Sequence, residues 1–290
     1  MNATPSLSVT SVDIATNNDY RVPVRWLPAA DARANLVLMA ALGVAARFYL
    51  PLATALRDAG FNVALVEQRG HGDSSLRPSR ETDYGFRDAL VDDIPAVIDW
   101  LGEQAPGLRC LLMGHSLGGH YAAITAGRLP EHVQGVILVA CGSPWVGGFT
   151  GRIRRQLQLL VRLIPLSGAL LGYYPGDKLG FGGREARTLM NDWRALAQTN
   201  VYSAFGLNAD LDAGIAAFTG PVLSLRLADD PFAPEAAMAA VTGKFQSAPV
   251  TRAVIDAQEL GDDADHFRWA RTPAAIVRRV QQWHAQQFAD

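Results

Sequence analysis

The sequence predicts a doubly wound α/β fold, in which helices cover both faces of a mostly parallel sheet. Three observations favour this class. Apolar runs that suit buried strands alternate with segments of helical period, and the 290 residues are 49% hydrophobic and only 19% charged, which is enough for a large core. The alternation also stops once, between about residues 142 and 220, and then returns.

Each predicted element follows from its own signal. Strands are short aliphatic runs bounded by polar or glycine-rich segments, and helices are longer segments that end near glycine or proline. In chain order, the elements are strand 35–41, helix 46–60, strand 62–68, helix 86–107, strand 109–113, helix 117–129, strand 133–140, helices 152–164 and 184–198, strand 221–228, helix 235–245, strand 251–257 and helix 273–288.

The interruption predicts a helical insertion within one core domain. We assign residues 1–141 and 219–290 to the core and residues 142–218 to the insertion, which contains no clear strand. The segment 152–164 carries one apolar helical face, and 184–198 reads as a second helix. Open parallel sheets bind ligands at the carboxyl ends of their strands, so we expect the insertion to form a lid there.

Composition and charge exclude several classes of function. The net charge is −2 without a long run of either sign, which gives no electrostatic case for nucleic acid. The first 20 residues lack the basic start and apolar stretch of a secretory signal. The most lipophilic stretch, 157–174, is interrupted by Arg162 and Pro165, which argues against a transmembrane segment. We therefore expect a soluble, cytoplasmic protein; the oligomeric state stays open.

No motif indicates a metal or cofactor. The chain has no H-E-x-x-H pattern, no spaced Cys/His cluster and no phosphate-binding glycine loop with its lysine. The acidic run 262–266 reads as a solvated loop. Cys110 and Cys141 lie beside strand-like runs and read as buried thiols, although a disulfide stays open.

The stretch GHSLGG places Ser116 between a strand and a helix, in the pattern G-x-S-x-G. A serine hydroxyl is a weak nucleophile unless a base takes its proton, and it must first be exposed. Gly114 and Gly118 leave room for a sharp turn that lifts Ser116 out of the backbone, and the amides that follow can stabilise an oxyanion. Ser116 is therefore the candidate nucleophile; an ordinary glycine-rich loop is the alternative.

The segments LLMGHSLGGHYA and VALVEQRGHGDSS resemble the α/β-hydrolase superfamily. Segments of the insertion, such as YYPGDKLGFG, resemble serine hydrolases of the monoglyceride-lipase and serine-aminopeptidase-like branches. The resemblance implies an α/β-hydrolase fold and a Ser-His-Asp triad whose residues follow the chain order nucleophile, acid, histidine.

The resemblance also implies which residues complete the triad. The acid follows a late strand, in a context that matches Asp230 through Pro234 better than Asp229, although either aspartate can also cap the next helix. His266, in a loop before the last helix, matches the family's histidine, with Asp265 replacing the usual glycine. We expect Asp230 to orient His266, and His266 to activate Ser116.

Two backbone amides are expected to form the oxyanion hole. One belongs to Leu117, after the nucleophile. The resemblance places the other in the loop after the first strand, at Leu42 with Gly43 as the alternative, because Tyr49 matches a frequent aromatic of the family. Gly43, Trp145 and Tyr173 are candidate substrate contacts. Other aromatic residues of the insertion, Phe149, Tyr174 and Trp193, can line a substrate site or form the core of the lid.

These residues predict a serine hydrolase that cleaves a carboxylic ester or related acyl compound of small, apolar character through an acyl-enzyme. The same triad can also carry acyl transfer, amide cleavage or carbon–carbon hydrolysis. A receptor that binds a small ligand without catalysis is the alternative from a different class.

Overall fold

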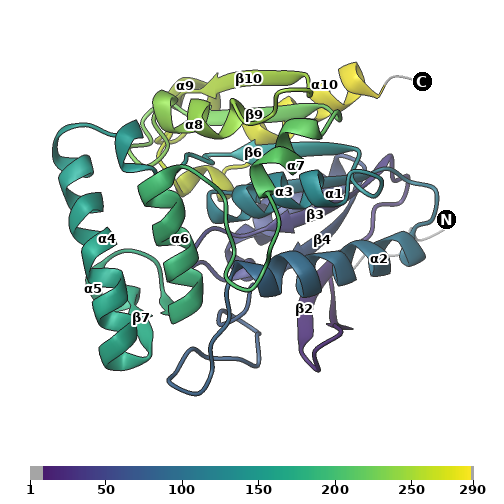
Figure 1. Ribbon diagram of the computed structural model, residues 1–290. Helices are drawn as coiled ribbons and strands as arrows, with labels where there is room; N and C mark the ends of the chain where they lie inside the picture. The colour runs from purple at the N-terminus through teal and green to yellow at the C-terminus, as the bar shows by residue number, and fades with distance from the viewer. Residues whose placement is uncertain (1–8, 289–290) are drawn as a thin grey trace.

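An eight-stranded sheet organises the chain, and the computed structural model describes it over residues 9–288 (Figure 1). The first eight residues, part of the segment judged above for a signal sequence, lie outside the described residues, as do 289 and 290. The strands of the sheet are β1 (Thr10–Ala15), β2 (Arg21–Leu27), β3 (Ala34–Met39), β4 (Phe61–Val66), β5 (Cys110–His115), β6 (Gly135–Val139), β9 (Val222–Leu227) and β10 (Val250–Ile255). Their spatial order is β1-β2-β4-β3-β5-β6-β9-β10.

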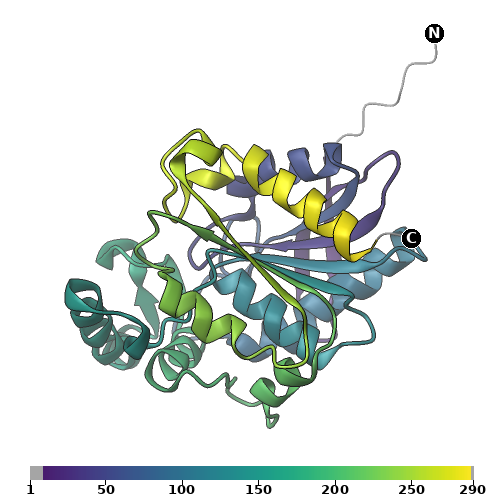
Figure 2. The same ribbon diagram turned by 90° about the horizontal axis from the view of Figure 1, so that it is seen from above.

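Six neighbouring strands of this sheet, from β4 to β10, run parallel, and β2 joins β4 antiparallel. Every residue of β3 and β5 is buried, because helices cover the sheet on both sides. Helices α1 (Leu50–Asp58) and α10 (Ala274–Gln287) cover one face, and α2 (Ile94–Gln104) and α3 (Leu117–Arg128) cover the other (Figure 2). Two apolar clusters, one on each face, form the core. The predicted doubly wound α/β class is confirmed.

The N-terminal strands β1 and β2 were not among the predicted elements. They pair antiparallel at the edge of the sheet, with Thr10 opposite Trp26 and Ala15 opposite Arg21. Only Ile14 of β1 is buried, because an edge strand faces solvent. Such a strand lacks the continuous apolar run that identifies a central parallel strand, so its sequence carries little signal.

The insertion between β6 and β9 contains two short strands in addition to the predicted helices. The strands β7 (Tyr173–Pro175) and β8 (Arg184–Ala186) form an antiparallel pair, which corrects the expectation of a segment without strands. Three residues are too few for a periodic pattern, so only the pairing reveals them. The helices are α4 (Gly151–Leu171), α5 (Gly176–Leu179), α6 (Arg187–Thr199) and α7 (Leu211–Ala217); the last two short helices of the core are α8 (Glu235–Thr242) and α9 (Ala257–Leu260).

Helix α4 continues through Pro165 to Leu171, seven residues beyond its predicted end, and stops at Gly172 with a left-handed φ of 83°. Pro165 is exposed, and the carbonyl of Val161, which loses its helical donor at Pro165, accepts instead from Arg194 Nε at 2.8 Å. Among the described residues, no helix is long and apolar enough to cross a membrane.

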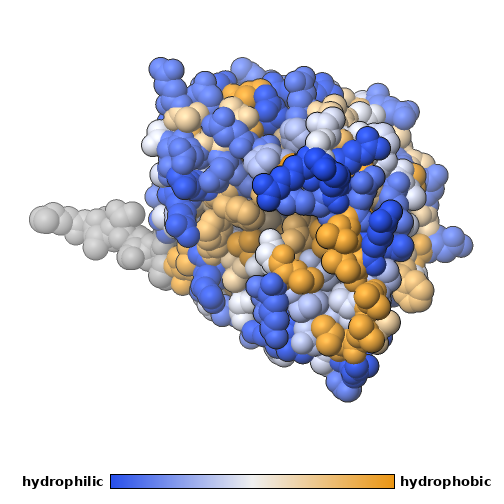
Figure 3. Space-filling model, turned by 90° about the vertical axis from the view of Figure 1, so that its left-hand side faces the viewer, coloured by the Kyte–Doolittle hydropathy of each residue, from blue (hydrophilic) through white to orange (hydrophobic). Residues whose placement is uncertain are grey.

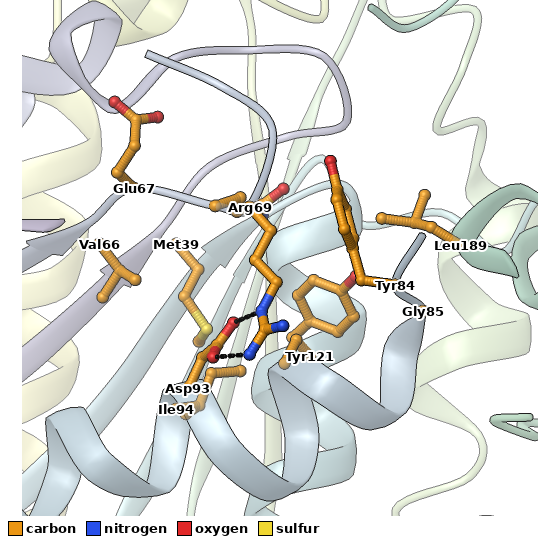
Figure 4. Close-up of a pocket in the computed structure, with 12 residues that line it drawn as sticks. Met39, Val66, Glu67, Arg69, Tyr84, Gly85, Asp93, Ile94, Tyr121 and Leu189 are labelled. Carbon is orange, nitrogen blue, oxygen red and sulfur yellow. Dashed lines mark hydrogen bonds and ion pairs between the residues drawn. The ribbon is translucent and has the colours of Figure 1, made fainter. Parts of the chain in front are cut away.

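The predicted helix 86–107 begins with a π-helical turn, Asp88–Asp93, before α2 starts at Ile94. Pro95 lies in the first turn of α2, where its missing N–H is tolerated. The π-helical turn holds Asp93 against Arg69, which comes from the loop after β4 (Figure 4). Arg69 donates from Nε and Nη2 to the two carboxylate oxygens, at 2.8 and 2.7 Å, and both side chains are buried.

We expect Arg69→Ala to lower the free energy of unfolding by about 3–5 kcal/mol, because it leaves the Asp93 carboxylate buried without its partner. Chemical denaturation measures the change. Arg25→Ala is the matched control, since Arg25 pairs at 2.6 Å with Asp73, which is half exposed; we expect a loss below about 1 kcal/mol there. Equal losses in the two variants would contradict this account of the Arg69 pair.

Candidate active site

Ser116 occupies a strained turn between β5 and α3. Its backbone has φ 51° and ψ −114°, a conformation that non-glycine residues rarely adopt. The glycines around it make the turn possible: a side chain on Gly114 would collide with the backbone of Gly118, and one on Gly118 with the carbonyl of Met39. The turn leaves the Ser116 side chain partly exposed at the amino end of α3.

Asp230 and His266 meet beside this turn, although 36 residues separate them in the chain. His266 Nδ1 lies 2.6 Å from Asp230 Oδ2, and both side chains are buried. Asp230 follows β9, where its other oxygen accepts hydrogen bonds from the amides of Phe232 and Ala233, at 2.8 and 3.2 Å. The carboxylate is therefore fixed, and it favours the His266 tautomer that has its proton on Nδ1.

Aromatic rings enclose the His266 imidazole. The ring centroids of His115, Phe267 and Phe232 lie 4.6, 4.8 and 5.4 Å from its own. The His266 carbonyl accepts a hydrogen bond from Trp269 Nε1 at 2.9 Å, which holds the loop in place. The described residues provide no hydrogen-bond partner for Nε2, the nitrogen that does not contact Asp230, and His266 lines the cavity that Ser116 also lines.

A buried network connects the turn at Ser116 with the loop after β3. The Tyr49 hydroxyl accepts a hydrogen bond from the amide of Ala41, at 3.1 Å, and lies 2.7 Å from His115 Nδ1. Because the hydroxyl can then donate to Nδ1, it favours a neutral His115. Burial, and then the neighbouring His266, lower the pKa of His115 well below its usual range. A neutral His115 places no second positive charge against His266.

The loop after β3 reaches the same cavity as Ser116. Gln68 donates to the carbonyl of Ala40 at 2.7 Å, so this loop is held at two successive residues, Ala40 and Ala41. Leu42 follows and lines the cavity beside Leu117, the first residue of α3. The amide of Leu117 belongs to the first turn of α3, whose amides have no acceptor within the helix. The residues whose amides are predicted to donate, Leu42 and Leu117, therefore line one cavity.

The cavity measures about 550 Å³ and is mostly apolar. Its walls come from both the core and the insertion, and its polar side chains include Ser116, His120 and His266. The aliphatic and aromatic wall is formed by Leu42, Leu117, Phe149, Ile153, Leu157, Leu159, Leu160, Leu163, Tyr174, Leu179, Phe181, Trp193, Phe232 and Phe267. Figure 3 faces the insertion side of the molecule, where apolar side chains gather around a hollow.

Three of the predicted substrate contacts do not line this cavity. Tyr173 precedes Tyr174 in β7, and since side chains alternate along a strand, Tyr174 faces the cavity while Tyr173 stacks on Arg184 at 3.9 Å. Trp145 is 37% exposed and packs against Gly147. Gly43 lies under the insertion, as described below. The predicted lining is corrected accordingly.

Two further residues close to the site were not singled out as partners in the sequence. Glu185 is fully buried and lies 3.1 Å from His71. It stands in a stretch that reads as the start of a helix, and nothing in that pattern marks a buried carboxylate. Phe267 follows His266 directly, but the sequence does not show that its ring packs on the imidazole.

Among residues 9–288, no group of three His, Cys, Asp or Glu side chains could hold a metal ion. The acidic residues of the loop before His266 pair instead with Arg268, which contacts Asp262, Asp263 and Asp265. The largely apolar cavity is thus lined by one serine and by one histidine that is paired with a carboxylate.

Residues 30–258 match the family model described as serine aminopeptidase, S33. The chain belongs to this family of hydrolases. The matched part of this S33 family member contains Ser116 and Asp230, and His266 lies beyond it. The resemblance to the α/β hydrolases is confirmed, and the order and direction of the strands agree with that fold.

Several known proteins are similar to this S33 family member. Monoglyceride lipase from Homo sapiens is 29% identical over 115 residues, 40% of this chain and 37% of that protein. The chain thus matches less than half the length of that relative. The 2-(acetamidomethylene)succinate hydrolase of Mesorhizobium japonicum is 28% identical over 246 residues, 79% of this chain and 80% of that protein. An esterase from Pyrococcus furiosus shares the fold with a TM-score of 0.63 and 16% identity, over 100% of this chain and 96% of that chain.

Proposed function

We propose that the protein is a serine hydrolase that cleaves a carboxylic ester of apolar character through an acyl-enzyme. One observation carries the proposal: the imidazole of His266, held by Asp230 at 2.6 Å, lines the same cavity as Ser116, which projects from a strained turn. A strained, exposed serine and an oriented histidine are the two requirements for nucleophilic attack on a carbonyl.

In the proposed reaction, His266 Nε2 takes the proton from Ser116 as its Oγ attacks the ester carbonyl. The amides of Leu117 and Leu42 stabilise the negative oxygen that forms. The imidazolium is stabilised by Asp230 and donates its proton to the departing alcohol. A water molecule, activated by His266, then attacks the acyl-enzyme and releases the acid, which restores Ser116.

The insertion, residues 142–218, serves in this proposal as a lid that shapes the substrate site. Helix α4 contributes Ile153, Leu157, Leu160 and Leu163 to the wall, and α6 contributes Trp193. Leucines of the lid also reach the outer surface, where Leu159 and Leu179 are more than half exposed while still lining the cavity. An apolar path of this kind favours a substrate with a medium-sized hydrocarbon part.

The names of similar proteins support ester cleavage, since they include a monoglyceride lipase and probable esterases from Oryza sativa. A fluorophosphonate probe tests the chemistry. We expect it to label the folded protein at one site, and mass spectrometry to place the label on the peptide containing Ser116. Labelling at another residue would mean that Ser116 is not the nucleophile, and no labelling of the folded protein would argue for a ligand receptor instead.

We expect kcat/KM for p-nitrophenyl esters to rise with acyl length until the cavity is filled. Each buried methylene contributes about 0.8 kcal/mol, or roughly a fourfold rise. Trp193→Leu widens the wall, so the best chain length should increase by one or more methylenes. Trp145→Leu is the control, because Trp145 does not line the cavity. An optimum that shifts equally in both variants, or in neither, would contradict this assignment of the acyl site.

A further inference from the structure

An ion pair joins the core to the insertion beside the proposed oxyanion hole. His71, in the loop after β4, places Nε2 at 3.1 Å from Oε2 of Glu185, the middle residue of β8. The Glu185 side chain is 0% exposed and that of His71 9%. A buried carboxylate needs hydrogen bonds and an opposite charge, and removing one partner of such a pair is strongly unfavourable. The pair therefore ties β8 to the core.

The second oxygen of Glu185 holds the segment that precedes it. Oε1 accepts a hydrogen bond from the amide of Gly183 at 2.7 Å. The backbone of Gly182 and Gly183 lies directly on Gly43, so closely that a side chain on Gly43 would collide with both residues. Gly43 also has a left-handed φ of 78°, which other residues rarely adopt. Backbone from the insertion thus rests on backbone of the loop after β3.

The same segment touches Leu42. Gly182 packs against the Leu42 side chain, because a Cβ added to Gly182 would lie 3.3 Å from Cδ2 of Leu42. Both residues line the cavity. On its other side the loop is held by Tyr49 and Gln68, through Ala41 and Ala40. On the side of the insertion, residues 182–183 therefore contact both Leu42 and Gly43.

The geometry points to His71 and Glu185 as a positioning pair that sets the Leu42 amide through residues 182–183. The inference rests on the proposed function, in which that amide stabilises the oxyanion. Neither side chain lines the cavity, so neither touches the substrate. An oxyanion donor must lie within a few tenths of an ångström of its best position. The pair of His71 and Glu185, which we call the clamp, can therefore influence kcat without touching the substrate.

The clamp is strongest when His71 is charged, because a charged donor makes a stronger hydrogen bond to a carboxylate. Burial disfavours the charged ring, but the bond to Glu185 and the charges of Glu185 and Glu67 outweigh it and raise the pKa of His71 above its ordinary value. A raised pKa in the folded protein means that this contribution is complete below about pH 6.5 and is lost as the pH rises through the folded pKa.

Several other titratable groups lie near His71 and Glu185. Arg77 lowers the pKa of His71. Three tyrosines also lie near Glu185: Tyr84, Tyr121 and Tyr174. Burial, and to a smaller extent the charge of Glu185, raises their pKa values, so these side chains stay uncharged at neutral pH. Glu67 accepts hydrogen bonds from the amides of Ala46 and Asp73, at 2.9 and 3.2 Å, and is the second acid near His71.

Kinetics of two variants test the clamp. Glu185→Gln keeps the shape but removes the charge, and we expect kcat for a p-nitrophenyl ester to fall by roughly tenfold to a hundredfold, with KM changed less than about threefold. The wild-type kcat should decline as the pH rises through the pKa of His71. His71→Gln can still donate to Glu185 but does not titrate, so this alkaline decline should disappear.

Amide hydrogen exchange separates failure of the clamp from failure of the proposed chemistry. In Glu185→Gln, the amides of residues 41–44 and 181–185 should exchange at least about tenfold faster than in the wild type. Arg187→Gln is the control: it breaks another tie between core and insertion, the 3.0 Å pair with Asp83, and should leave residues 41–44 unchanged.

Unchanged exchange at 41–44 in both Glu185→Gln and His71→Gln would overturn the clamp, whether or not the protein cleaves esters. Loss of probe labelling at Ser116 in the wild type would instead overturn the proposed function alone. If Glu185→Gln does not fold, His71→Ala, which cannot donate to Glu185, replaces it in the exchange measurement, and His71→Gln still tests the pH profile.

Discussion

Ser116→Ala is expected to abolish fluorophosphonate labelling and to lower kcat for p-nitrophenyl esters by roughly a factor of 10⁶, the scale seen when a triad serine is removed. The physical reason is that, in the proposed mechanism, the covalent acyl intermediate forms on the Ser116 oxygen. His266 remains, but it would have to activate water directly on the ester. Stopped assays at high enzyme concentration measure the residual rate.

Two companion variants sharpen the result. Ser143→Ala removes another buried serine hydroxyl, which donates to Asn200 at 2.7 Å, and should keep its labelling. Ser116→Gly should be as inactive as Ser116→Ala but more stable by about 1 kcal/mol, because glycine adopts φ 51° and ψ −114° without strain. Ester turnover that survives in Ser116→Ala would mean that another residue is the nucleophile.

Asp230→Asn is expected to lower kcat by about 10⁴-fold with little change in KM. The asparagine can still accept from the amides of Phe232 and Ala233, so the loop should keep its shape. Its NH₂ group would face His266 Nδ1, however, and would favour the tautomer that has its proton on Nε2. That tautomer cannot take the proton of Ser116. The effect should therefore appear in kcat and in the labelling rate.

Asp229→Asn is the matched control for this prediction. Asp229 is adjacent in sequence, but the 2.6 Å contact with His266 is made by Asp230. We expect Asp229→Asn to stay within about twofold of the wild type. The opposite ranking of the two variants would assign the acid to Asp229 and would require the loop after β9 to rearrange in solution.

The sequence by itself was sufficient for the central architecture. Nearly every residue of β3, β4, β5, β6 and β9 is buried, because helices cover both faces of the sheet. Each strand is therefore an almost continuous apolar run, which predicts a strand from the sequence alone. The turn at Ser116 was also readable from the pattern G-x-S-x-G, although only Gly114 is required by a local contact, with Gly118, whereas Gly118 is required by the approach of Met39 in β3. Elements whose stability comes from partners, such as the edge strand β1 and the pair β7–β8, left no such signal.

The candidate site, like the fold, could be predicted only in part from the sequence. The G-x-S-x-G motif singles out Ser116, and the resemblance to the α/β hydrolases implies Asp230 and His266 as its candidate partners. Which aspartate contacts the imidazole, and which tyrosine of β7 faces the cavity, depends on side-chain direction, which packing sets.

The buried pair of His71 and Glu185 was decided by tertiary structure alone. The two residues are 114 positions apart. The segment RGHGDSS indicates a structural or pocket-lining role for His71, but no pattern predicts that Glu185 is buried or that the two side chains meet. Local sequence fixes backbone preferences and turns over a few residues, whereas the meeting of distant charges depends on how the insertion folds back onto the sheet. Only that packing brings a buried carboxylate, a histidine and the loop at Leu42 together.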